Sequence, residues 1–103
     1  MKFLVFNMFD VDKTAEMSQV SDKIQANPPP GIKTLAMYMC MGIPFPGFPP
    51  NTLLGISVIE AESSEAIAAE TYPAALAGAT VWWVPVLESA IGAVSEQEKK
   101  YRA

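Results

Sequence analysis

Apolar positions along the chain follow two periods, and these periods predict the order of its strands and helices. In residues 1–9 both alternating faces are apolar, which predicts a strand that is covered on both sides. The same pattern returns in residues 33–41 and 53–61, and residues 80–88 form a fourth predicted strand. Pro85 requires an edge or an unpaired position in that strand, because proline has no N–H to donate.

Helical spacing separates the first two predicted strands. Residues 11–26 carry apolar side chains at i, i+3 and i+7, which predicts an amphipathic helix. The apolar stripe consists of Met17, Val20 and Ile24. Asp10 or Asp12 can cap the start of this helix, and the run NPPPG ends it because prolines cannot continue helical hydrogen bonding.

A second helix is predicted between the last two strands. The run ESSEAIAAETY supplies a capping serine, either Ser63 or Ser64. Pro73 should end or kink this helix, and a short second piece should stop at Gly78. After the fourth strand, residues 89–103 are predicted to form an amphipathic helical tail.

The predicted order is therefore strand, helix, strand, strand, helix, strand, followed by the tail. This is the ferredoxin-like βαββαβ plan, an α+β fold in which an antiparallel sheet carries two helices on one face. The other face would be bare and apolar, which favours pairing with the same face of a second copy. We expect a single domain over residues 1–103, with its core in residues 1–88 and the helical tail in residues 89–103.

The composition is apolar and weakly acidic. Half of the 103 residues are apolar and 17% are charged, which excludes a disordered chain. A domain of this size has much surface for its volume, so we expect a homodimer that buries the apolar excess. The net charge is −4 and no basic run is longer than Lys99–Lys100, which argues against nucleic acid as a partner.

A long stretch without charge, residues 34–59, raises the question of a membrane segment. Four prolines in its middle would break a helix and free backbone groups that lipid cannot satisfy, so no membrane segment is expected. The apolar run in residues 3–9 stops at Asp10 and is read as a strand rather than as a secretory signal. The single Cys40 cannot form an internal disulfide and fits a reducing compartment, so a cytoplasmic location is expected.

Residues 42–51, GIPFPGFPPN, form the most apolar loop of the chain, between the second and third predicted strands. The loop has no charge, and its prolines stiffen it. Phe45 and Phe48 need cover, which either a partner subunit or the mouth of a cavity can provide. A dimer contact is favoured over a lid, because obligate interfaces absorb apolar loops readily. A proline-reading partner is a weaker interpretation, because no Arg or Lys flanks the prolines.

Four short motifs, MKFLV, PPPGIK, VIEAES and VPVLE, occur in this order along residues 1–88. Together they resemble small domains of unknown function in the dimeric α+β barrel superfamily, which is similar in fold to cofactor-free antibiotic-biosynthesis monooxygenases, haem-degrading monooxygenases and muconolactone isomerases. The resemblance implies that two ferredoxin-like subunits pair their sheets into a barrel, with a cavity between the sheet and helices of each subunit. The long Pro-rich loop departs from the short turn usual in the nearer family.

The haem-degrading branch offers a residue-by-residue comparison. Asn7 matches an asparagine late in the first strand, and Tyr72 lies about where a tryptophan is usual. The histidine that binds haem has no counterpart, because the chain contains no histidine. The resemblance therefore implies no haem of that kind, and we expect no cofactor.

The lack of histidine also excludes Ser-His-Asp and Cys-His nucleophile systems and any metal site built on histidine. One cysteine cannot form a thiolate zinc site. Asp10 and Asp12 are too few carboxylates for calcium, and capping is the simpler role for them. No metal site is therefore expected, and no glycine-rich phosphate loop is present in the sequence.

Five residues are candidates for a ligand pocket: Asn7, Tyr38, Tyr72, Trp82 and Trp83. Asn7 interrupts an apolar strand, so its amide must bond either to backbone or to a ligand that it orients. Tyr38 and Tyr72 could likewise either pack in the core or contact a ligand, and core packing is favoured. The two tryptophans are consecutive on a strand and point to opposite faces, so one should enter the core or cavity and the other should meet the dimer partner.

Two hypotheses for the function follow, and the sequence leaves open whether the protein is an enzyme. The first is a homodimeric domain with an apolar cavity that binds a small hydrophobic molecule. The alternative is a cofactor-free monooxygenase or isomerase acting on an aromatic or polyketide-like substrate, positioned by Asn7, Tyr38 and Tyr72. The alternative requires Asn7 and Tyr72 to face the same side of the sheet.

Overall fold

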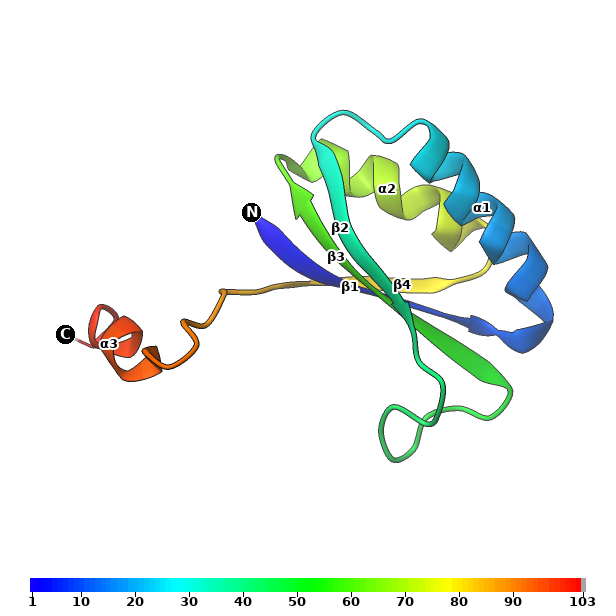
Figure 1. Ribbon diagram of the computed structural model, residues 1–103. Coiled ribbons are helices and arrows are strands. Elements are labelled where there is room, and N and C mark those ends of the chain that lie inside the picture. Colours follow the sequence, from blue (N-terminus) through cyan, green and yellow to red (C-terminus); the bar gives the residue numbers. More distant parts are fainter. Residues whose placement is uncertain (103) are drawn as a thin grey trace.

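Four antiparallel strands form the sheet on which the rest of the chain is arranged (Figure 1). The structure is a computed structural model that describes residues 1–102. In the spatial order β2-β3-β1-β4, the strands are β2 (Ile32–Met39), β3 (Thr52–Ala61), β1 (Lys2–Asp10) and β4 (Thr80–Pro85). The predicted α+β class is confirmed, although β2 and β4 end before the predicted Met41 and Glu88.

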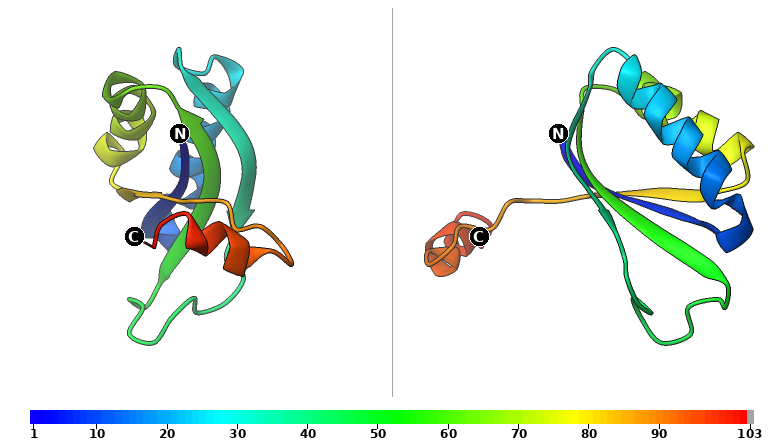
Figure 2. Two further views of the ribbon diagram at one scale, coloured as in Figure 1. Left: turned by 90° about the vertical axis from the view of Figure 1, so that its left-hand side faces the viewer. Right: turned by 45° about the vertical axis from the view of Figure 1, so that its right-hand side comes forward.

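Two helices cover one face of this sheet. The helix α1 (Thr14–Ala26) follows a 3-10 turn, η1 (Val11–Lys13), and lies beside α2 (Ser64–Leu76). Figure 2 shows both helices on the same side of the sheet. A third helix, α3 (Val94–Lys99), lies near the C-terminus. Within residues 1–102, no helix combines the length and the hydropathy needed to cross a membrane.

The core lies between the helices and the sheet. Alternate side chains of β1 point toward the helices, and of these Phe3, Val5 and Phe9 are buried. Cross-strand pairing brings buried Ile59 beside Phe3. The helices and the segment that follows α2 add Met17, Ala66, Ala74 and Ala79. The sheet and Met17 of α1 therefore supply the large core residues, and small alanines let α2 pack closely against them.

The helix ends agree with the sequence prediction in part. Ser63 Oγ accepts a hydrogen bond from Ala66 N at 3.1 Å, which confirms the predicted cap of α2. The predicted capping by Asp10 or Asp12 is wrong, because no side chain in the described residues caps η1 or α1. The 3-10 turn instead leads the chain into α1.

Pro73 lies inside α2, which does not end there but continues to Leu76, and the predicted stop at Gly78 is confirmed, since Gly78 follows the last residues of the helix with φ 110°. A proline within a helix removes the hydrogen bond to the carbonyl four residues earlier, here that of Ala69. Because Ala69 is exposed, water can satisfy that carbonyl. The helix therefore tolerates a proline in its last turn.

The consecutive tryptophans of β4 face opposite sides of the sheet, as the alternation of a strand requires. Trp83 is half-buried on the helix-covered side, where its Nε1 donates to Thr71 Oγ1 at 2.7 Å and its ring meets Phe3 edge to face at 5.4 Å. Trp82 lies on the other side and stacks on Phe6 with the ring centroids 5.2 Å apart. The indole of Trp83 thus ties β4 to α2.

The side of the sheet without helices is termed the open sheet face. Strand register places on it Leu4, Phe6, Met8, Ile56, Val58 and Trp82. All six side chains stay partly exposed in the described chain. Leu54, which lies on this face beside the loop between β2 and β3, is only 2% exposed. The open sheet face therefore presents an apolar surface across three strands.

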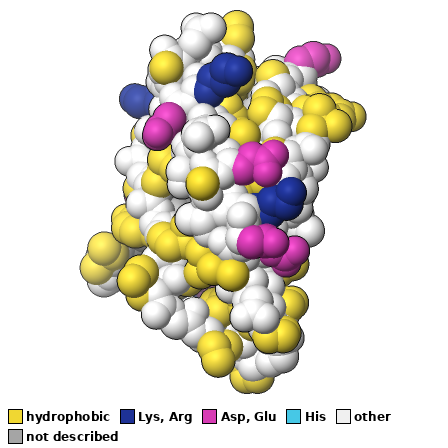
Figure 3. Space-filling model, turned by 90° about the vertical axis from the view of Figure 1, so that its right-hand side faces the viewer, with side chains coloured by type: hydrophobic (Ala, Val, Ile, Leu, Met, Phe, Trp, Pro, Cys, Tyr) yellow, Lys and Arg dark blue, Asp and Glu magenta, His cyan; other side chains and the backbone are white. Residues whose placement is uncertain are grey.

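Residues 40–51, termed the Pro-rich loop, join β2 to β3 at one end of the sheet. Both ends of the loop are tied down, because Cys40 N donates to Leu54 O at 2.9 Å and Val11 N donates to Asn51 O at 2.8 Å. The rings of Phe45 and Phe48 meet edge to face at 5.2 Å. In the view of Figure 3, charged side chains lie over the upper and middle parts of the molecule, and the lowest part shows a hydrophobic or neutral surface.

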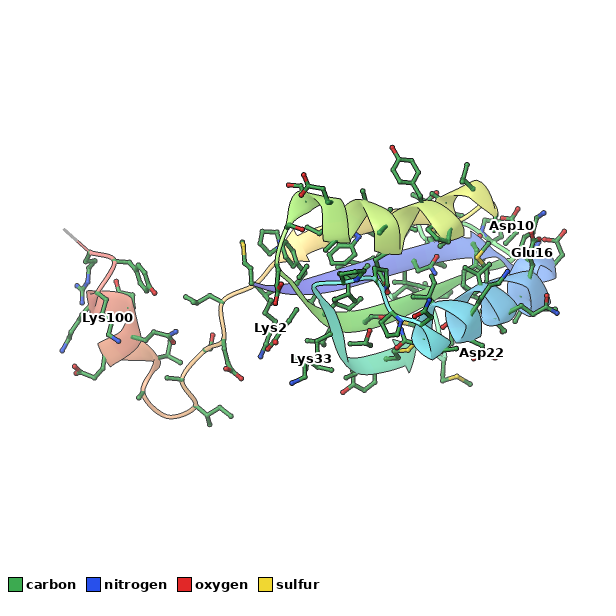
Figure 4. The ribbon with its side chains drawn as sticks, turned by 90° about the horizontal axis from the view of Figure 1, so that it is seen from above. Lys2, Asp10, Glu16, Asp22, Lys33 and Lys100 are labelled. Carbon is green, nitrogen blue, oxygen red and sulfur yellow. The ribbon has the colours of Figure 1, made fainter. Side chains whose placement is uncertain are left out.

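Residues 86–102, termed the C-terminal arm, continue from β4 and run away from the sheet (Figures 1 and 4). The radius of gyration is 15.7 Å, whereas a compact domain of about 100 residues has roughly 13 Å. The projecting arm and loop account for the excess. Of the helical tail predicted for residues 89–103, the structure shows a helix only at Val94–Lys99, and residue 103 lies outside the described residues.

The cap of α2 can be tested with a matched pair of serines. Ser63→Ala should lower the free energy of unfolding by about 1 kcal/mol, because Ala66 N–H loses its acceptor. Urea denaturation followed by circular dichroism measures the loss. Ser64→Ala, at the first residue of the same helix, should change stability by less than about 0.5 kcal/mol. Equal losses in the two variants would contradict the assignment of Ser63 as the cap.

Candidate functional site

A hollow of about 300 Å³ lies between α1 and the sheet. It is termed the Asn7 cavity. The sheet contributes Asn7, Phe9, Met37, Tyr38, Met39 and Gly55 to its lining, and α1 contributes Thr14, Met17, Ser18, Ser21 and Asp22. Figure 4 shows Asp22 on α1, on the side where β2 forms the edge of the sheet. The cavity is therefore apolar on its sheet side apart from Asn7, and polar along α1.

Asn7 is the polar group at the base of this cavity. Its Oδ1 is buried and has no hydrogen-bond partner in residues 1–102. A buried amide oxygen without a partner costs on the order of 1–3 kcal/mol, so such an atom calls for an explanation. Less than 1 Å² of this oxygen is accessible, so an O–H or N–H donor of a ligand in the cavity would reach it after a rotation of the Asn7 side chain.

Gly55 pairs with Asn7 across β1 and β3 and leaves room beside it. A Cβ at this position would lie 3.7 Å from Tyr38 O and 3.9 Å from both Asn7 O and Met39 Cε. These are ordinary van der Waals distances, so the glycine is not required for backbone geometry. Its effect is to keep the cavity open.

The α1 side of the cavity carries hydroxyl groups at helical spacing. Thr14 Oγ1 donates to Val11 O at 2.6 Å, and Ser18 Oγ donates to Thr14 O at 2.8 Å. Each hydroxyl thus donates its hydrogen bond to a backbone carbonyl and retains lone pairs that can accept another. Asp22 is the one charged side chain in the lining, so an anionic ligand is disfavoured.

The structure brings together fewer of the sequence-predicted pocket residues than expected. Asn7 and Tyr38 border the same cavity, but Tyr38 pairs with Ile56 and its side chain therefore lies on the open sheet face, 62% exposed. Tyr72 is 63% exposed on α2. Neither Trp82 nor Trp83 belongs to the cavity lining in the described chain. Of the five candidates, Asn7 alone lines the cavity from the helix-covered face of the sheet.

The Pro-rich loop does not cover this cavity. Among residues 40–51, which the structure describes in full, none belongs to its lining. Phe45 is 47% exposed, and Phe48 is half-buried against a second hollow at the root of the loop. The arrangement gives no support to a lid over the Asn7 cavity, and the dimer contact of these two phenylalanines stays a prediction.

Several cavity residues were not expected from the sequence. Gly55 interrupts an apolar strand, and an isolated glycine there indicates open space or a close approach of another group. Thr14, Ser18 and Ser21 follow each other at i, i+4 and i+7, which places three small hydroxyls on one side of α1. Both signals are visible in the sequence beside the apolar stripe of the same helix.

Glu70 of α2 is a second polar group without a partner. Its Oε2 is buried and lacks a hydrogen bond to any described residue. Burial raises the pKa of the Glu70 carboxyl above its ordinary value of 4.5. The carboxyl is not part of the Asn7 cavity lining, so a ligand there would not pair with it. Its burial without a partner therefore lowers the stability of the fold.

Comparison of the chain with protein-family models and with curated proteins gave no match. The assignment of the site therefore rests on the geometry described above.

Glu70 should make the stability of the fold depend on pH. Because its pKa is higher in the folded than in the unfolded chain, the stabilisation from protonation is complete below pH 4.5 and is lost as the pH rises through the raised value. Glu70→Gln is neutral at every pH, so it should raise the melting temperature more at pH 7 than at pH 4. Glu65→Gln, in the first turn of the same helix, should instead lower it at pH 7. The same gain for Glu70→Gln at both pH values would contradict the account.

Proposed function

We propose that the chain is a ferredoxin-like domain of the dimeric α+β barrel superfamily, in which two copies pair their open sheet faces and each binds a small hydrophobic molecule in its Asn7 cavity. The order β1-α1-β2-β3-α2-β4 along the chain and the sheet order β2-β3-β1-β4 support the ferredoxin-like plan. The four motifs from MKFLV to VPVLE support the superfamily. A cytoplasmic location stays a prediction from the single cysteine.

The contrast between the two faces of one sheet carries the dimer proposal. On the helix-covered face Phe3 is buried, whereas on the open face Phe6 and Trp82 stack on each other and remain in contact with water. A continuous apolar surface of this kind marks an interaction site in most proteins. A second copy matches it by symmetry, because a two-fold contact places the same face on both partners.

The ligand proposal rests on the chemistry of the Asn7 cavity. Its volume of about 300 Å³ is at the lower end of ligand pockets, which suits a molecule of one or two rings. The unpaired Oδ1 of Asn7 requires a donor, so the ligand should carry a hydroxyl or N–H group on an apolar body. Asp22 makes a neutral molecule a better fit than an anion.

The geometry gives no support to the monooxygenase or isomerase alternative. That hypothesis needs Asn7, Tyr38 and Tyr72 to converge on one substrate. Tyr38 is instead on the opposite face of the sheet from Asn7. Tyr72 lies on α2, on the same side of the sheet as Asn7, but its side chain is exposed. The proposed function is therefore limited to binding.

A charge on the open sheet face should separate the proposed dimer. Phe6→Lys would place an ammonium group without a counter-ion between two apolar sheets. The dissociation constant of the dimer should rise by at least ~100-fold, as removal of one partner of a buried charge pair does. Size-exclusion chromatography over a concentration series measures the change.

Tyr72→Lys is the matched control for this substitution. It exchanges an aromatic residue for the same charge on the exposed surface of α2, away from the open sheet face. Its elution should equal that of the unmodified chain. Equal elution of Phe6→Lys and the unmodified dimer would refute pairing through this face.

The Asn7 cavity can be probed with two small aromatic molecules that differ in one donor. We expect 1-naphthol to bind about 3–10-fold more tightly than naphthalene, because its hydroxyl can donate to Asn7 Oδ1. Asn7→Leu should remove the preference, and Gly55→Leu should abolish binding of both probes by filling the cavity. Titration followed by tryptophan fluorescence measures the affinities. A preference for 1-naphthol that survives Asn7→Leu would contradict the assigned role of Asn7.

A further inference from the structure

The C-terminal arm exposes its apolar side chains. The exposed fraction is 65% for Leu87 and 54% for Val94, and Ile91 is fully exposed. The only helix of the described arm, α3, has six residues, and a helix this short is not stable in water without packing against another surface. The arm therefore needs apolar cover that the described part of its own chain does not give.

The arm nevertheless has a defined bend. The side chain of Gln97 holds it, because Nε2 donates to Glu88 O and Oε1 accepts from Ala90 N, each at 2.8 Å. Val86 N donates to Lys2 O at 3.1 Å, which fixes the direction in which the arm leaves β4. The bend presents Ile91 just before the turn at Gly92, whose φ is 81°. The arm thus holds the exposed Ile91 in a defined position from which it can contact another surface.

A second hollow, of about 660 Å³, lies at the root of the Pro-rich loop and is termed the loop hollow. Its apolar lining includes Cys40, Met41, Ile43, Phe48 and Leu54, and its lining within residues 1–102 contains no charged side chain. Leu54 of this lining belongs to the open side of the sheet, because it pairs with Met8, whereas Met39 and Leu53 lie on the helix-covered side. The loop hollow therefore lies at the end of the sheet and borders its open face at Leu54.

The arm and the Pro-rich loop, at whose root the loop hollow lies, leave the sheet at opposite ends (Figure 1). The arm follows Pro85, which pairs with Phe3 near the start of β1. The loop precedes Thr52, which pairs with Asp10 at the end of β1. A two-fold axis across the strands, with the open faces together, would bring the arm of each copy to the loop hollow of the other.

We propose that each arm inserts Leu87 and Ile91 into the loop hollow of the partner copy, an inference that rests on the proposed dimer. An uncharged apolar hollow matches the uncharged side chains that the arm leaves exposed. The exchange is reciprocal, so one dimer fills two hollows. The Pro-rich loop then serves as the receptor for the arm, and its prolines hold the receptor open.

The lone cysteine of the chain lies in the loop hollow, so a cysteine in the arm gives a direct crosslinking test. Ile91→Cys, treated with a short bismaleimide, should give a covalent dimer that joins Cys40 of one copy to the new thiol of the other. Adding Cys40→Ser to Ile91→Cys should abolish that product. Leu76→Cys, a site 83% exposed at the end of α2, is the matched control and should give no covalent dimer.

The outcomes separate the arm exchange from the dimer itself. A covalent dimer that survives Cys40→Ser would show that arm meets arm and would overturn the exchange. No crosslinking of Ile91→Cys in a chain that elutes as a dimer would overturn the exchange and leave the dimer standing. Elution of the unmodified chain as a monomer would overturn both.

A second measurement does not depend on thiol chemistry. Leu87→Ser combined with Ile91→Ser should raise the dissociation constant of the dimer by ~100-fold, because two large apolar side chains lose their burial. Leu76→Ser, outside both surfaces, should leave the constant unchanged. An unchanged constant in the arm variant would contradict the exchange, and thermal unfolding of both variants checks that the domain stays folded.

Discussion

A sheet with two apolar faces and helices for only one of them is the constraint on which the rest of this structure depends. Alternate residues of β1 divide between the faces, so that Phe3 is buried under the helices while Phe6 stays partly exposed with Trp82 stacked on it. Burial of apolar surface is the main favourable term in folding, and the apolar side chains of the open face stay partly in contact with water in a single chain. The proposed dimer, the position of the Pro-rich loop and the exposed arm all follow from this imbalance.

The strands could be predicted because alternation is a local property that the sequence shows directly. Both-face apolar patterns placed β1, β2 and β3 to within two or three residues. The helix ends were harder, because they depend on single hydrogen bonds and on solvent access to one carbonyl. The helix α2 continues past Pro73, and the carbonyl that loses its hydrogen bond belongs to Ala69, which is exposed to water. The exposure of Ala69 cannot be derived from the sequence.

Asn7 could be predicted as a site residue because an amide in an apolar strand must find a partner. The tyrosines could not be placed, since the direction of Tyr38 depends on strand register and that of Tyr72 on how α2 sits on the sheet. Gly55 was not predicted as a cavity residue, because it has no side chain and contributes to the cavity only by leaving space. The cavity is therefore a tertiary feature, formed where this gap in β3 meets the hydroxyl side of α1.

The central claim is that the open sheet face is covered by a second copy of the chain. Light scattering of the unmodified protein at micromolar concentration tests it most directly, because the method gives the mass in solution without a tag or a probe. The account predicts a mass of two chains, each of 11.1 kDa. A mass of one chain at the same concentration would contradict it.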